Sequence, residues 1–109
     1  MPTAKPQIVV CTYRVRKGKD AAFRKLIRKH WATLNRLGLV AKEPRLVMRG
    51  LDRDNLGDLI EIFAWKPGGF ERAHKLPDVL AIWEPMEMLC ESRGGRPSME
   101  FPHYERLPA

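Results

Sequence analysis

The sequence has few of the features that mark a membrane protein or a secreted, disulfide-rich protein. No apolar run approaches the roughly 20 residues that cross a bilayer, and residues 1–7 lack the apolar core of a signal peptide. The two cysteines, Cys11 and Cys90, lie far apart and have neither metal-ligand spacing nor the density of a disulfide scaffold. We therefore expect a cytoplasmic protein with reduced, buried cysteines and no membrane association.

The signatures of several enzyme classes are absent as well. The two Gly-Gly pairs lack the GxGxxG and Walker spacings that hold phosphate groups. There is no Gly-x-Ser-x-Gly elbow, no Cys-His nucleophile pair with an orienting third group and no close pair of carboxylates. The histidines have no HxxxH or HxxE spacing, so we expect no metal site. A hydrolase therefore has no support from the residues.

Acidic residues are scarce in the first half of the chain. Residues 1–54 hold 14 lysines and arginines against 4 acidic residues, and the whole chain has a net charge of +7. Much of this charge falls where a long helix can carry it on its solvated side. We favour that interpretation over a surface that binds an anionic partner.

What the sequence does contain is the composition of an ordinary folded protein. Its 109 residues are 44% hydrophobic and 30% charged, which is unlike a disordered segment. Two separate halves would each be too small to bury a useful core. We therefore expect a single domain over residues 1–109, with its core at about residues 7–106.

Apolar periodicity predicts the first half of the fold. Residues 7–16 are rich in β-branched residues and apolar on both faces, which predicts a strand covered by protein on both sides. A 3/4 spacing of apolar residues from position 19 to Gly38 predicts an amphipathic helix. Residues 45–51 and 58–66 then predict two strands joined by a turn.

Prolines interrupt the predicted elements of the second half. A helix should start near Phe70, break at residues 76–78 and resume with a bend near Pro85, because proline cannot donate to the helical ladder. Residues 99–106 predict a last strand, in which Pro102 implies an edge position or a bulge.

The order βαββαβ predicts a ferredoxin-like α+β fold. Its four-stranded antiparallel sheet carries both helices on one face. The opposite face of the sheet must then be covered by other protein. The strand predicted at residues 7–16 indicates the same, because it is apolar on both faces.

A run of short motifs adds a resemblance to a known family. The third predicted strand ends in Trp65 and is followed by Phe70, Ala73-His74, a proline and the stretch from Val79 to Trp83. This order is similar to that of the antibiotic-biosynthesis-monooxygenase type of dimeric α/β barrel. The resemblance implies a homodimer whose two sheets face each other, with a pocket between the sheet and helices of each subunit. Some members of that family oxygenate aromatic polyketides or quinols without a cofactor, and others bind or degrade haem.

The haem-degrading branch of that family carries an asparagine on its first strand and a tryptophan and a histidine on its second helix. Thr12 stands on the first strand here, and His74 and Trp83 lie at opposite ends of the helical region. The set is not reproduced, so we expect neither haem nor any other cofactor.

Two histidines are candidate catalytic residues. His74 matches the Ala-His pair of the resembled family, and His30 lies on the apolar face of the first predicted helix. An imidazole in either place could act as a general base, because its pKa lies near working pH. The alternative for both is a structural histidine bonded to backbone carbonyls. His103, on the last strand, could be an interface residue.

Aromatic side chains are the candidate ligand contacts, because they could line a flat apolar cavity for an aromatic ligand. They are Tyr13, Trp31, Phe63, Trp65, Phe70 and Trp83. At helical and strand spacing the same residues also form ordinary cores. Glu61 shares a strand face with some of them and needs a cationic partner, which we expect to be Arg14 or Arg49 at a dimer interface.

Three functions follow from these observations. The resemblance implies a small-molecule-pocket protein, with cofactor-independent monooxygenation of an aromatic, phenolic or quinol-like substrate as its activity. The alternative is a non-catalytic ligand-binding or sensing protein with the same pocket. RNA-binding domains share the βαββαβ order, but IVVCTY and LIEIFAW lack their stacking aromatic signature, so we expect no nucleic-acid partner.

Overall fold

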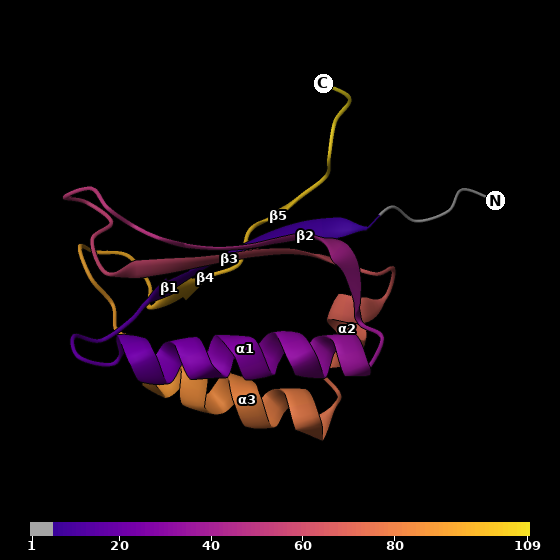
Figure 1. Ribbon diagram of the computed structural model, residues 1–109, viewed down its shortest axis with the longest axis horizontal. Coiled ribbons are helices and arrows are strands. Elements are labelled where there is room, and N and C mark those ends of the chain that lie inside the picture. The colour runs from indigo at the N-terminus through magenta and orange to yellow at the C-terminus, as the bar shows by residue number, and fades with distance from the viewer. Residues whose placement is uncertain (1–5) are drawn as a thin grey trace.

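The computed structural model describes residues 6–109. Its elements are β1 (Gln7–Arg14), α1 (Asp20–Arg36), β2 (Val40–Arg49), β3 (Asp58–Trp65), α2 (Gly69–Ala73), α3 (Pro77–Met88), β4 (Met99–Glu100) and β5 (His103–Tyr104). The strands form one antiparallel sheet in the order β2-β3-β1-β4, and β5 also pairs with β1. The helices lie on one face of this sheet (Figure 1). The predicted ferredoxin-like α+β fold is confirmed.

The core fills the space between the sheet and the helices. One face of β1 contributes buried side chains at Val9, Cys11 and Tyr13, and the apolar face of α1 covers them with Phe23 and Ile27. Both elements therefore owe their position to the burial of one apolar face, as their residue periodicity indicates.

The edge strand β2 is longer than the sequence predicts. It begins at Val40, not at Arg45, and its pairing with β3 is irregular between these two residues. Pro44 lies inside it. A proline cannot donate to a sheet ladder, but an edge strand has one side without a partner strand and tolerates it.

The prolines of the second half act largely as predicted. The helical region breaks at residues 74–76, slightly earlier than the predicted 76–78, and α3 starts at Pro77, where a missing backbone donor leaves no helical hydrogen bond unmade. The predicted last strand is divided in two around Pro102, at the edge of the sheet beside β1. α3 continues through Pro85.

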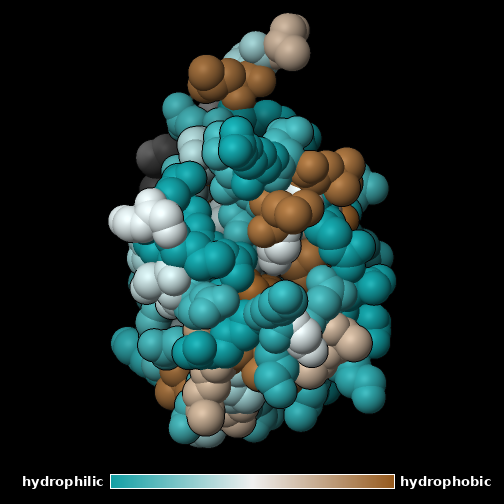
Figure 2. Space-filling model, turned by 90° about the vertical axis from the view of Figure 1, so that its left-hand side faces the viewer, coloured by the Kyte–Doolittle hydropathy of each residue, from teal (hydrophilic) through white to brown (hydrophobic). Residues whose placement is uncertain are grey.

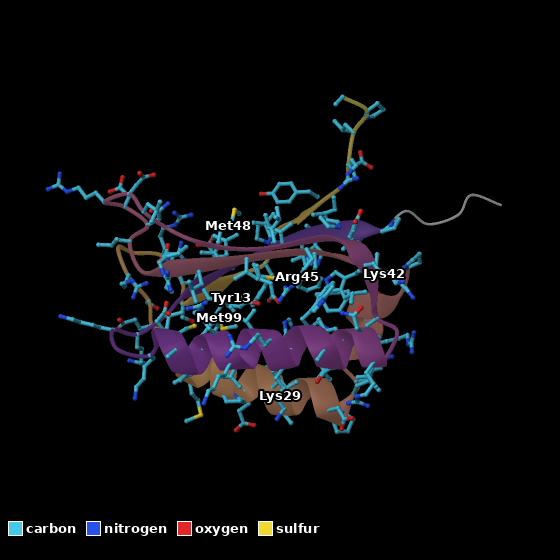
Figure 3. The ribbon with its side chains drawn as sticks, in the orientation of Figure 1. Tyr13, Lys29, Lys42, Arg45, Met48 and Met99 are labelled. Carbon is cyan, nitrogen blue, oxygen red and sulfur yellow. The ribbon has the colours of Figure 1, made fainter. Side chains whose placement is uncertain are left out.

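The sheet face opposite the helices is apolar. Val10 and Leu46 flank Ile62 on this face, and Met48 lies opposite Ile60. Leu46 and Met48 are 51% and 44% exposed, and Met48 points away from the helices (Figure 3). The end of the molecule with the β2–β3 loop and the start of α1 is mainly hydrophilic instead (Figure 2).

Over residues 6–109, we find no helix with the length and apolarity needed to span a membrane.

Candidate functional site

A cavity of about 360 Å³ lies between the sheet and the helices. Its lining is largely apolar and aromatic and comes from both layers and from the last segment of the chain: Val9, Cys11, Tyr13, His30, Phe63, Trp65, Phe70, His74, Trp83, Met86, Glu87, Ser98, Met99, Phe101 and His103. His74, Glu87 and Phe101 are exposed, and they mark its opening. Tyr13 and Met99 point into the space between sheet and helices (Figure 3). The size and lining suit a small aromatic molecule.

The fold brings five of the six candidate ligand contacts to this cavity. Tyr13, Phe63, Trp65, Phe70 and Trp83 line it. Trp31 does not: it follows His30 directly on α1, about 100° around the helix, and its ring packs on Phe63 and under the Arg45 guanidinium, 4.5 Å away.

Both candidate catalytic histidines also line the cavity, in different surroundings. His30 is 3% exposed. Its Nδ1 lies 3.1 Å from Oε1 of Glu61, and its Nε2 accepts a hydrogen bond from the indole N–H of Trp83 at 2.9 Å. Both ring nitrogens of His30 are therefore engaged.

His74 lies at the end of α2 and is exposed. Its Nδ1 donates to the backbone carbonyl of Phe70 at 2.9 Å, and its ring stands edge-on to the rings of Phe70 and Trp83, 4.5 and 4.9 Å away. A neutral imidazole that donates from Nδ1 keeps its lone pair on Nε2. His74 thus has a basic nitrogen that this contact leaves free.

Glu61 lies wholly buried behind the cavity wall, at 0% exposure. The Tyr13 hydroxyl donates to its Oε1 at 2.6 Å and Arg45 donates to its Oε2 at 2.5 Å, in addition to the His30 contact. The prediction that Arg14 or Arg49 pairs with Glu61 is wrong. Arg14 pairs with Asp58 and Glu100, and Arg49 pairs with Asp20. Glu61 also faces the helices, not the sheet face where a partner subunit was expected.

The protonation states of this cluster follow from its contacts. Burial by itself raises the pKa of Glu61, but His30, the Tyr13 hydroxyl and Arg45 together hold that pKa below its ordinary value. Burial and the neighbouring carboxylate raise the pKa values of Tyr13 and Cys11. At neutral pH Glu61 is ionised, while the phenol and the thiol stay protonated, so Cys11 is not a nucleophile.

His103 also lines the cavity, a position that the residue pattern of the last strand did not predict. On β5 it pairs with Val9 of β1, and both residues line the cavity. Its Nε2 and the indole nitrogen of Trp65 are buried without a hydrogen-bond partner. Alternation of side chains along a strand could have predicted this position, but only if the register of β5 with β1 had been known.

No group of three or more His, Cys, Asp or Glu side chains that could hold a metal ion occurs in residues 6–109.

No protein-family model matches the sequence, and no curated protein resembles it significantly in sequence. Solved structures do resemble it in fold. The cofactor-independent oxygenase SnoaB from Streptomyces nogalater is 20% identical, with 97% of each chain covered and a TM-score of 0.72. PA3566 from Pseudomonas aeruginosa is 16% identical, with 99% of this chain and all of the other covered and a TM-score of 0.72. A protein described as antibiotic biosynthesis monooxygenase is 9% identical, with 94% and 99% covered and a TM-score of 0.69.

Sequence identities this low show a shared fold and nothing about function. The resemblance that the sequence motifs indicated is confirmed at that level: the chain has the ferredoxin-like α+β fold that SnoaB and antibiotic biosynthesis monooxygenases share.

Proposed function

We propose that the protein is a cofactor-independent monooxygenase that acts on a small aromatic, phenolic or quinol-like molecule in the cavity. The observation that supports this most is the cavity itself, which combines a wall of aromatic rings with histidine nitrogens. The fold likeness to SnoaB, described as a cofactor-independent oxygenase, agrees with it.

The proposed reaction needs a base and an apolar cavity from the protein. A histidine of the cavity, His74 or His30, accepts the proton of an acidic phenol or of its keto form, such as a hydroxyanthrone. The electron-rich anion reduces dioxygen and combines with it, the proton returns to give a hydroperoxide, and loss of water leaves a carbonyl. In balance, a CH₂ group and O₂ become a C=O group and H₂O, with the substrate as the only reductant. An apolar lining admits oxygen and keeps water from the anion.

Oxygen uptake tests this proposal. We expect uptake with a 1,8-dihydroxyanthrone above the rate of spontaneous oxidation, with the quinone as product. The catalysed rate of the double variant His30→Ala/His74→Ala should be at least about 100-fold lower, which is the usual size of a general-base contribution. Lys75→Ala, next to His74 but outside the cavity lining, is the control. Failure to accelerate oxidation over a broad panel of phenols and quinols contradicts the proposal.

The alternative is a binding or sensing protein without turnover. The engaged nitrogens of His30 favour it, since each already has a hydrogen-bond partner within the protein. A ligand that copurifies with the protein and is returned chemically unchanged after incubation in air supports this alternative.

We further propose that the protein is a homodimer. Its apolar sheet face, with Val10, Leu46, Met48, Ile60 and Ile62, suits a second copy of the same face. Two sheets stacked in this way would bury their exposed apolar side chains against each other.

We also propose that the protein is cytoplasmic. Cys11 and Cys90 are free and buried, as in proteins of a reducing compartment. Cell fractionation tests this location, and recovery from an extracellular fraction contradicts it.

A further inference from the structure

A buried carboxylate stands directly behind two residues of the cavity wall. Glu61 does not line the cavity, but the Tyr13 hydroxyl and the His30 ring that bond to it both do. A fully desolvated charge is costly unless it is paired, and Arg45 supplies the pairing cation from β2. The carboxylate is thus held ionised at the rear of His30.

The two hydrogen bonds of His30 define its tautomer. An indole N–H can only donate, so Nε2 of His30 must carry its lone pair toward Trp83. The proton of the neutral ring is then on Nδ1, which donates to Glu61. This is the arrangement of a carboxylate–imidazole general base, in which the carboxylate fixes the tautomer and stabilises the imidazolium that forms.

The basic nitrogen of this pair is covered by a cavity residue. Trp83 is half-buried on α3 and lines the cavity, with His74 beside its ring. Its indole N–H occupies the one position from which Nε2 of His30 can accept a proton. A ligand hydroxyl is also a hydrogen-bond donor, so it can take the place of that N–H.

We propose that Glu61 and His30 form a gated proton-accepting pair, with Trp83 as the gate and a phenolic hydroxyl as the group that displaces it. This inference rests on the proposed function in assuming a phenolic ligand in the cavity. In the transfer step the ligand O–H bond breaks and an N–H bond forms at Nε2. The resulting imidazolium faces Glu61, and Arg45 remains the counter-charge of the carboxylate. Glu61 is a positioning residue, because it acts through His30.

The proposal restricts the class of ligand. A compound with a hydroxyl donor can compete with the indole, whereas its methyl ether has only an acceptor and cannot. The charged and titratable groups around the pair are Tyr13 and Cys11 from β1, Arg45 from β2 and His74 from α2, the last on the far side of Trp83.

Nitrogen NMR of the full chain, labelled with ¹⁵N, tests the gate with 2-naphthol and 2-methoxynaphthalene. We expect the Nδ1–H tautomer of His30 in the free protein. 2-Naphthol should shift both the Nε2 signal of His30 and the indole N–H signal of Trp83, and the ether should leave Nε2 unchanged. Binding of 2-naphthol without a response from Nε2 overturns the gated pair but not the proposed function. If neither compound binds, the gated pair is overturned, whereas the proposed function is decided separately by the oxygen-uptake assay.

Two substitutions separate a gate from a plain wall. Trp83→Phe keeps a ring but removes the competing N–H, so 2-naphthol should bind about five-fold more tightly, the value of one ordinary hydrogen bond. Affinity for the ether should not rise. Trp31→Phe, at a tryptophan outside the cavity lining, is the matched control. Equal weakening of both ligands by Trp83→Phe shows a plain wall and overturns the proposal.

Glu61→Gln tests the positioning role. We expect a mixed tautomer of His30, since an amide can donate or accept, and a fall of at least about ten-fold in kcat/KM for the hydroxyanthrone, as for lost hydrogen bonds to charged groups. A fixed Nδ1–H tautomer with an unchanged rate contradicts the role. If this variant does not fold, Trp83→Phe carries the test.

Discussion

At the scale of single residues, the structure depends on how Glu61 is compensated. Desolvation alone would favour the neutral acid, yet three donors from three elements, Tyr13, His30 and Arg45, converge on the two carboxylate oxygens. Together they hold the pKa of Glu61 below its ordinary value. The carboxylate therefore links β1, α1 and β2 to the centre of β3.

This linkage gives a pH-dependent contribution to stability. A lowered pKa in the folded state stabilises the protein above the ordinary value of 4.5, and the contribution is lost as the pH falls through the folded-state pKa. We expect Glu61→Gln to lower the free energy of unfolding by about 2 kcal/mol at pH 7. The difference from the unsubstituted protein should shrink below pH 4.5.

Urea denaturation at a series of pH values measures this difference. Glu84→Gln, at an exposed carboxylate on α3, is the control. A destabilisation by Glu61→Gln that stays constant down to pH 3 would contradict a charged Glu61 in the folded protein.

The partners of Glu61 show what residue patterns leave out. Its charge on an apolar strand face was enough to predict a paired carboxylate. The identity of the cation was not predictable, because Arg45 reaches it only through the irregular pairing of β2 with β3. The place of His103 in the cavity likewise depends on a register, that of β5 with β1.

At the scale of elements, α1 is predicted best because a single periodic pattern specifies it. The 3/4 spacing gave its buried face, and Gly38, at φ +70°, follows its end as a C-terminal glycine should. The edge elements were predicted less well. Pro44 and Pro102 mark local interruptions, but whether a strand continues past a proline depends on its neighbours in the sheet.

The buried face of α1 supplies an element-scale prediction. Phe23 is fully buried against Tyr13, with ring centroids 4.8 Å apart. We expect Phe23→Ala to lower the free energy of unfolding by about 3–5 kcal/mol, from lost apolar burial and the cavity left behind. Arg24→Ala, at the next and exposed position, should change it by less than about 0.5 kcal/mol. Thermal and urea unfolding compare the two, and similar effects from both would refute this packing.

At the scale of the whole molecule, two apolar regions lie on opposite faces of one sheet. The face toward the helices encloses the cavity, and the opposite face carries the exposed side chains of Leu46 and Met48. The first region supports the proposed ligand site and the second supports the proposed homodimer.

The homodimer predicts a specific response to charge. Met48→Lys would place an ammonium group between the paired sheets. We therefore expect the Kd of the dimer to rise at least ten-fold, a loss of about 1.4 kcal/mol of binding free energy. Met88→Lys, on the exposed side of α3, should leave it unchanged. Light scattering over a dilution series gives the mass. A monomeric unsubstituted protein at high concentration would rule out the dimer.

The proposed functions of this protein all require a ligand to bind in the cavity between the sheet and the helices. Met99 is half-buried in its wall, and tryptophan at this position would fill part of the space. Calorimetric titration with 2-naphthol should show binding to the unsubstituted protein and to Met88→Trp, an exposed control on α3. Met99→Trp should bind at least ten-fold more weakly, a loss of about 1.4 kcal/mol. Equal affinity in Met99→Trp and Met88→Trp would contradict binding in this cavity.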